Sequence, residues 1–247
     1  MISTEHTSKQ FDVDLDTVKT QVLQMGGLVE SQVQLAIEAL ISDDVPSMNR
    51  VINDDHRVNA MEVQIDENCS QIIARRQPTA GDLRMVMTMV KTITDLERIG
   101  DEAAKIARIG KLLSQGKRLV LPRYTEIKHI AELALDMLRK SLDAFARLDL
   151  HYTAQVVRQD DLVDEEFRTI LRYLITYMME DPRTISTALE ILFIAKAIER
   201  VGDHAKNISE YVVYMVKGKD VRHVTVEEIE REVLEKFATE RIDTFYK

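Results

Sequence analysis

The sequence predicts an all-α fold of two antiparallel three-helix bundles that are related by internal duplication. Glycine and proline number only 8 and 4 in 247 residues, too few for an all-β chain that turns about every 8–12 residues. Apolar residues recur with helical spacing over long stretches. The motif Glu97-Arg98-Ile99-Gly100-Asp101 returns 102 positions later as Glu199-Arg200-Val201-Gly202-Asp203. Together these observations indicate long helices in two equivalent halves.

The first half is expected to hold three helices, over about residues 12–41, 45–77 and 80–115. Pro46 and Pro78 lie between these stretches, as expected for a residue that cannot continue a helix. Short loops favour antiparallel neighbours, so the three helices should pack as an up-and-down bundle. The core stripe of the first helix is expected to be Leu15, Val22, Val29, Val33 and Ile37.

The second half repeats this pattern, with helices expected over about residues 123–148, 150–180 and 183–217. Pro122 and Pro182 separate these helices from the stretches before them. The two bundles could lie end to end or side by side. The predicted units are a first bundle over 12–115, a second bundle over 122–218 and a C-terminal tail over 219–247.

Two glycines mark predicted helix ends. Gly116 and Gly218 each stand beside a lysine and are expected to cap the third and sixth helices. The linker 116–121 then joins the two halves. In the tail, Thr225 and Glu228 have the spacing of a capping box and predict one short helix.

Composition excludes several classes of function. The 42 acidic and 33 basic residues give a net charge of −9 without an evident basic face, so direct nucleic-acid binding is not expected. The single Cys69 cannot form an internal disulfide and is expected to be a buried, inert thiol in a reducing cytosol. The N-terminus lacks signal-peptide features, and no apolar run of about 18 residues occurs. We therefore expect a cytoplasmic protein that reaches a membrane only through partners.

The repeated motif places Glu97 and Asp101 on one face of a helix, where like charges repel. The glycine between them costs about 1 kcal/mol relative to alanine. Because both disfavoured choices occur twice, we expect them to serve a function. Gly100 and Gly202 are expected to let a metal, water or a partner backbone approach the helix.

The turn at Pro78 predicts which residues face this pair. Asn59 lies 19 residues before Pro78 and Glu97 lies 19 after it, whereas Asp55 and Asp101 are each 23 residues away. Residues equidistant from the turn of an antiparallel hairpin lie at the same height. The first half is therefore expected to gather these four oxygen-bearing side chains.

The second half gives the same geometry around Pro182. Asp164 lies 18 residues before it and Glu199 lies 17 after, while Asp160 and Asp203 lie 22 before and 21 after. Such clusters would repel without compensation, and oxygen ligands suit a divalent or trivalent ion such as Mg, Mn or Fe. The sequence thus predicts one metal site in each half.

Alternatives remain open at this point. The acidic faces could simply be solvated, with Arg98–Glu102 and Asp101–Lys105 as ordinary intrahelical ion pairs. A ferritin-like metalloenzyme or metal store, and a metal-free structural bundle, are the rival functions.

Other candidate residues give little reason to expect an enzyme. Glu126 and His129 have the spacing of di-iron bundles, but those need two such motifs. His204 has no counterpart in the first half and is expected to pair locally or contact a partner. No phosphate-binding glycine loop or nucleophile–base pair is evident. The methionines expected to fill gaps in the core are Met85, Met87, Met89, Met178 and Met179.

The repeated motif, together with segments 58–66, 76–84, 177–185 and 216–224, resembles the PhoU family over nearly the whole chain. The resemblance implies two three-helix bundles with pseudo-twofold symmetry. Asn59 makes the first implied site one charge poorer, so the two sites are expected to differ in affinity. The metal ligands implied by the family pattern are Asp55, Asn59, Glu97, Asp101, Asp160, Asp164, Glu199 and Asp203.

The resemblance also implies a function. PhoU-like proteins restrain the phosphate-starvation response and phosphate uptake by coupling the phosphate ABC transporter to a sensor histidine kinase. The implied partners are a second copy of the chain, the transporter ATPase and the kinase. The implied location is the cytoplasm, with peripheral attachment to the inner membrane through these partners.

Overall fold

The computed structural model describes residues 9–115, 124–222, 224 and 227–228. These residues form six long helices and contain no strand, which confirms the all-α prediction. Each helix end lies within three residues of its predicted position. The elements are α1 (Lys9–Ser42), α2 (Val45–Arg76), α3 (Ala80–Gln115), α4 (Tyr124–Arg147), α5 (His151–Glu180), the 3₁₀ turn η1 (Pro182–Thr184) and α6 (Ile185–Lys217).

Local chemistry fixes the helix ends. The Asp44 carboxylate accepts a hydrogen bond from the Ser47 backbone N–H (3.3 Å) and caps α2. The predicted cap at Gly218 is confirmed, since its φ of 72° is left-handed and favours glycine. The turn η1 was not predicted; Asp181 accepts a hydrogen bond from the Arg183 backbone N–H (3.1 Å) there. Gly116 and Thr225 lie outside the described residues.

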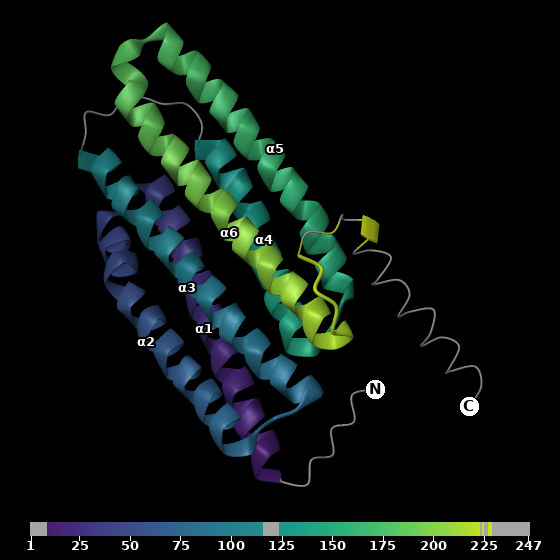
Figure 1. Ribbon diagram of the computed structural model, residues 1–247. Helices are drawn as coiled ribbons and strands as arrows, with labels where there is room; N and C mark the ends of the chain where they lie inside the picture. The colour runs from purple at the N-terminus through teal and green to yellow at the C-terminus, as the bar shows by residue number, and fades with distance from the viewer. Residues whose placement is uncertain (1–8, 116–123, 223, 225–226, 229–247) are drawn as a thin grey trace.

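The helices pack as two three-helix bundles that lie side by side (Figure 1). Helices α1–α3 form the first bundle and α4–α6 the second. Between the bundles, α3 packs along α6 and α1 contacts α4, so α3 and α6 occupy the centre with α2 and α5 outside them. One continuous apolar core runs through both bundles, and it includes all five positions of the predicted α1 stripe.

Gly26 allows the close approach of α1 to α4. A Cβ atom at this position would lie 2.5 Å from Leu142 Cδ2, well inside van der Waals contact. Nearby, the Arg139 guanidinium binds Glu30 across the same interface (Nε–Oε1, 2.6 Å). The two bundles are therefore joined by both packing and charge.

Two of the methionine predictions are wrong. Met89 is buried, and Met85 and Met178 pack against the core, but Met87 is 42% exposed and Met179 is 80% exposed.

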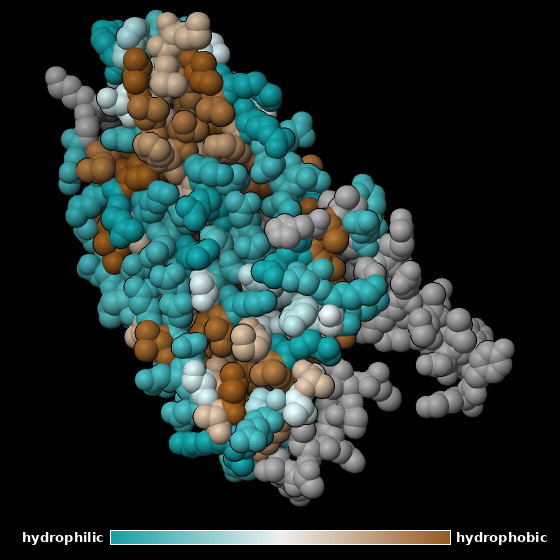
Figure 2. Space-filling model, viewed as in Figure 1, coloured by the Kyte–Doolittle hydropathy of each residue, from teal (hydrophilic) through white to brown (hydrophobic). Residues whose placement is uncertain are grey.

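Figure 2 shows apolar side chains gathered at the end of the α5–α6 hairpin. No helix among the described residues is both long and apolar enough to cross a bilayer. The exposed apolar residues at that end are Ile175, Met179, Ile185, Leu189 and Phe193.

Candidate functional site

The first cluster consists of Asp55 on α2 with Glu97 and Asp101 on α3. Burial raises the pKa of Asp55, and the charge of Asp101 raises it further. The pKa of Glu97 is also raised, by burial and then by the charges of Asp101, Glu62 and Asp55. The structure therefore brings these three carboxylates near one another across the α2–α3 hairpin. Glu62 adds a negative charge that the sequence reasoning missed.

The first cluster has positive charges nearby but no ion pair: the charge of Arg108 lowers the pKa of Asp55 and that of Arg98 lowers the pKa of Glu97, against the larger raising effects. None of its three carboxylates forms an ion pair with a residue that the structure describes. Asp55 Oδ1 is fully buried and accepts no hydrogen bond. Such an orphaned oxygen costs about 1–3 kcal/mol, and a bound cation would satisfy it. Asn59, the fourth predicted ligand, is exposed on α2.

The second cluster consists of Asp160 and Asp164 on α5 with Glu199 and Asp203 on α6. Asp160 and Glu199 are buried, each with 8% exposure. The pKa of Asp203 is raised to about 6 by burial and by the charges of Glu199 and Asp160. Burial also raises the pKa of Asp160. All four predicted residues of this half thus influence one another.

Three basic side chains pair with the carboxylates of the second cluster: Lys196, Lys206 and Arg168, here called the built-in cations. Sequence reasoning missed them, although the spacings Lys196–Glu199 and Arg168–Asp164 are those of intrahelical ion pairs. Lys196 Nζ also lies 5.4 Å from the centroid of the Phe167 ring. The three pairs, with their N···O distances, are Lys206–Asp160 (2.6 Å), Lys196–Glu199 (2.5 Å) and Arg168–Asp164 (2.9 Å).

Neither cluster is a preformed metal cage. Over the described ranges, no three or more His, Cys, Asp or Glu side chains are already arranged to hold an ion. The carboxylates would have to turn toward a common point before an ion could bind. In the second cluster they would also have to leave the built-in cations. The chemistry of the donors fits an oxygen-preferring cation, and the orphaned oxygen of Asp55 favours the first cluster.

The expectation for the two motif glycines is wrong. Both are buried, and they face neighbouring helices rather than open space. A Cβ atom on Gly100 would lie 3.3 Å from Val58 Cγ1, and one on Gly202 would lie 3.5 Å from Val163 Cγ1. Gly100 therefore permits the close packing of α3 on α2, whereas a Cβ atom at Gly202 would make ordinary van der Waals contact with α5.

The ordinary ion pairs of the solvated-face alternative do not form. Glu102 binds Lys105 (Nζ–Oε2, 3.1 Å) and, from α6, Arg200 (Nε–Oε1, 3.2 Å), rather than Arg98. The ion pair that Lys105 forms is therefore with Glu102 and not with Asp101. The charge of Asp101 is left facing the other carboxylates of the first cluster.

The remaining candidate residues have structural roles. His204 Nδ1 lies 2.7 Å from Asp95 Oδ1, and both side chains are buried between α6 and α3. His204 thus pairs across the bundle interface rather than locally. His129 is exposed and lies 3.9 Å from Glu166. Cys69 is buried as expected, and burial raises the pKa of its thiol to about 12.

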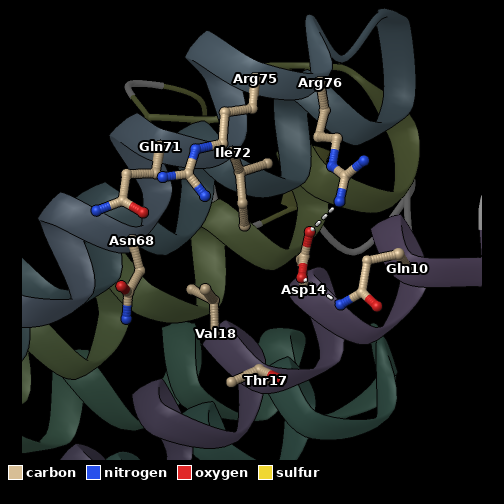
Figure 3. Close-up of a pocket in the computed structure, with 9 residues that line it drawn as sticks. All are labelled: Gln10, Asp14, Thr17, Val18, Asn68, Gln71, Ile72, Arg75 and Arg76. Carbon is tan, nitrogen blue, oxygen red and sulfur yellow. Dashed lines mark hydrogen bonds and ion pairs between the residues drawn. The ribbon is translucent and has the colours of Figure 1, made fainter.

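A polar pocket of about 320 Å³ lies between the start of α1 and the end of α2 (Figure 3). Asp14 accepts hydrogen bonds from Gln10 and Arg76, each 3.0 Å long, and these bonds lower its pKa. Thr17, the one hydroxyl of the lining, donates to the Val13 carbonyl (2.7 Å). The pocket therefore shows no activated nucleophile, and no predicted ligand lines it.

Comparisons with known proteins agree with this architecture. The family model described as the PhoU domain matches residues 22–110 and again 127–212. A Pseudomonas putida protein named phosphate-specific transport system accessory protein PhoU homolog is 47% identical over 232 residues, covering 93% of this chain and 90% of that protein.

Solved structures extend the match to the fold. PhoU from Pseudomonas aeruginosa is 47% identical and superposes with a TM-score of 0.81, covering 85% of this chain and all of that one. A phosphate transport system regulatory protein PhoU from Streptococcus pneumoniae is 29% identical, with a TM-score of 0.79 over 85% of this chain and 99% of that one. The two matched halves are the two bundles, and the chain belongs to the PhoU family.

Proposed function

We propose that this chain is a metal-binding adaptor that restrains phosphate-starvation signalling and phosphate uptake when phosphate is plentiful. The match to the PhoU family over both bundles carries the proposal. Relatives of this length are named as accessory or regulatory proteins of phosphate transport systems. The chain would act as an adaptor and not as an enzyme.

The carboxylate clusters supply the physical means of regulation. A bound Mg, Mn or Fe ion would provide positive charge against carboxylates whose pKa values are raised by burial and then by one another's charge. In the first half it would be held by Asp55, Glu97 and Asp101 with Asn59 beside them. Because these residues belong to two helices, binding would favour one packing of α2 on α3 and change the charge that the bundle presents.

The proposed partners are a second copy of the chain, the ATPase of the phosphate ABC transporter and a phosphate-sensing histidine kinase. The adaptor would be cytoplasmic and held at the inner membrane by these proteins. The exposed apolar residues at the end of the α5–α6 hairpin support a role in protein contacts.

A complementation experiment tests the proposal. Cells lacking their own copy would express the parent or Glu97→Gln/Asp101→Asn, and a starvation-controlled reporter would be measured in phosphate-replete medium. We expect the parent to repress the reporter and the double variant to repress it weakly. Pull-downs from the same cells should recover less kinase and ATPase with the variant.

The matched control is Asp66→Asn/Glu67→Gln, which removes the same two charges from an exposed part of α2. It should repress like the parent. Full repression by the Glu97/Asp101 variant would contradict the proposed role of the cluster. Metal-dependent turnover or ferrous-iron-dependent oxygen consumption would favour the ferritin-like alternative.

A further inference from the structure

We propose that the acidic segment of the chain, residues 226–237, docks on the corner of the same molecule where α3 begins beside the end of α6 (Figure 1). The inference goes beyond the proposed function and does not depend on metal binding. The residues that form this α3–α6 corner are Leu83, Arg84, Met87 and Lys91 on α3 with Tyr211 and Tyr214 on α6.

Arg84 has a guanidinium group whose hydrogen bonds are not made. Its Nε atom is fully buried and donates to no acceptor, and the side chain forms no ion pair with a residue that the structure describes. The group packs against Gly218 at the end of α6, where a Cβ atom would lie 2.6 Å from Arg84 Nη1. An oxygen acceptor brought to this guanidinium would therefore be bound favourably.

Lys91 is a second cation at the corner without a carboxylate partner in the described part of the chain. Its Nζ atom lies 5.6 Å from the centroid of the Tyr211 ring and 5.3 Å from that of Tyr214. Lys91 follows Arg84 by seven residues, which is about two helical turns on the same side of α3. The two cations therefore form a positive row beside α6.

The carboxylates near this row are engaged elsewhere. Asp220 is bound by Arg222 (Nε–Oδ1, 2.9 Å), and Asp95 is bound by two side chains of α6. Asp82 stands two residues before Arg84, and residues with this spacing do not share a face of a helix. The positive row is thus left to be matched by acidic groups from another part of the chain.

The end of the second bundle leads the acidic segment to this corner. Val221 is buried in the core, which fixes the chain after α6. Burial raises the pKa of Tyr211 and the charge of Arg222 acts against that rise, so the chain has turned back beside α6 at Arg222. From Arg222 to Val226 the chain spans at most about 14 Å. The segment therefore starts within reach of the corner.

The acidic segment matches the corner in charge and in apolar pattern. Residues 227–235 include five glutamates and one basic residue. Leu83 and Met87 are exposed one turn apart on α3, and methionine, tyrosine and arginine are typical of protein interfaces. The apolar residues of the segment recur at the three- and four-residue spacing of one helix face, at Val226, Ile229, Val233 and Phe237.

Docking would satisfy both features of the corner at once. The glutamates would lie against Arg84 and Lys91, while the apolar stripe of the segment would cover Leu83 and Met87. The corner would then be open to a protein partner only when the segment has left it.

Disulfide trapping in the full chain tests this docking. Met87→Cys/Val233→Cys places one thiol on the corner and one on the segment, and the native Cys69 is buried. The comparison pair is Val13→Cys/Val233→Cys, whose first position is exposed on α1 at the same end of the molecule (Figure 1). Under mild oxidation we expect the first pair to close at least about tenfold faster than the second, because docking raises the effective concentration of the thiols.

Removal of the cations separates docking from simple proximity. In the background of the first pair, Arg84→Gln/Lys91→Gln should slow disulfide formation by about fivefold or more, and about 1 M NaCl should have a similar effect. The matched control, Arg50→Gln/Arg75→Gln, removes two exposed cations from α2 and should leave the rate unchanged. Circular dichroism would establish that each variant is folded.

Three outcomes would overturn the proposal. The first is an equal rate of trapping at positions 13 and 87. The second is a rate at position 87 that responds neither to the loss of Arg84 and Lys91 nor to salt. The third is a disulfide that joins two molecules, seen as a dimer on a non-reducing gel, because it would show that the corner binds a second copy and not its own segment.

Discussion

Asp101 illustrates how single residues in the first cluster oppose folding in the absence of metal. It is exposed, yet its charge raises the pKa values of Asp55 and Glu97. A raised carboxylate pKa means that the ionised form is less stable in the folded protein than in the unfolded chain. The cluster therefore costs stability that a bound cation would restore.

Replacing Asp101 with Asn should for this reason stabilise the metal-free protein. We expect the free energy of unfolding at pH 8 with chelator to rise by about 0.5 kcal/mol, a small value because solvent screens the site. The same variant should lose the increase in melting temperature that Mn²⁺ gives the parent. Glu67→Gln should change neither quantity. A destabilised chelated Asp101→Asn protein would show that its charge does not oppose folding.

Glu210 gives a separate prediction of pH dependence. Burial raises the pKa of Glu210 from 4.5 to about 7. The negative charges of Asp160 and Asp220 raise this pKa further, whereas the positive charges of Lys206 and Arg222 lower it. Because the folded-state pKa is the higher one, stability is lost as pH rises from about 4.5 to about 7.

Glu210→Gln should remove that loss. With chelator present, urea unfolding at pH 8 should show the variant more stable than the parent by about 1–2 kcal/mol, after allowance for partial screening. At pH 4.5 the two proteins should differ little, because the parent carboxyl is then protonated when folded. A difference that does not change with pH would refute the assignment.

The helices themselves follow from the sequence because their signals are local. Apolar periodicity places the α1 stripe inward, and Asp44 with Pro46 starts α2 where the pattern predicts. The turn η1 escaped prediction because Asp181 and Pro182 tighten the chain before α6 begins. The sequence also left open whether the bundles lie side by side or end to end. That arrangement depends on the contact between α3 and α6, and the spacing of residues within one helix does not predict which other helix it packs against.

The site was predicted in part for a similar reason. Counting from Pro78 and Pro182 predicted which residues lie level across each hairpin, and in each cluster the carboxylates do act on one another's pKa values. That they bind a metal stays a prediction. The role of the glycines was misjudged because a sequence does not show that Gly100 faces Val58. Lys206 was missed because its partner, Asp160, lies on another helix.

The contact between α3 and α6 depends on a buried polar pair. His204 and Asn207 on α6 both bind Asp95 Oδ1 on α3, at 2.7 and 3.2 Å. Breaking such a pair leaves a buried polar group without its partner. This network is therefore expected to fix how the two bundles meet.

Asp95→Ala should lower the free energy of unfolding by about 3 kcal/mol, because it leaves the buried side chains of His204 and Asn207 without their hydrogen-bond acceptor. Lys128→Ala, which breaks an exposed pair with Glu132 (3.7 Å), should change it by less than about 0.5 kcal/mol. Urea unfolding followed by circular dichroism measures both. Equal effects of the two changes would show that the interface pair contributes no more than a surface pair.

The whole molecule is a duplicated bundle whose halves share a scaffold but differ in charge. Both halves place carboxylates level across a hairpin, and the central α3–α6 contact joins them into one core. In the second half Lys196, Lys206 and Arg168 pair with three of the four carboxylates, while burial and the neighbouring charges still raise the pKa of Asp203 to about 6. None of the first cluster's three carboxylates has such an ion pair, although the positive charges of Arg108 and Arg98 act on Asp55 and Glu97.

Anomalous diffraction from crystals of the full chain grown with Mn²⁺ would test this most directly. We predict an anomalous peak between α2 and α3, within coordination distance of Asp55, Glu97 and Asp101. A map without a peak at the first cluster, at a Mn²⁺ concentration that raises the melting temperature, would contradict the assignment of these residues as the metal site.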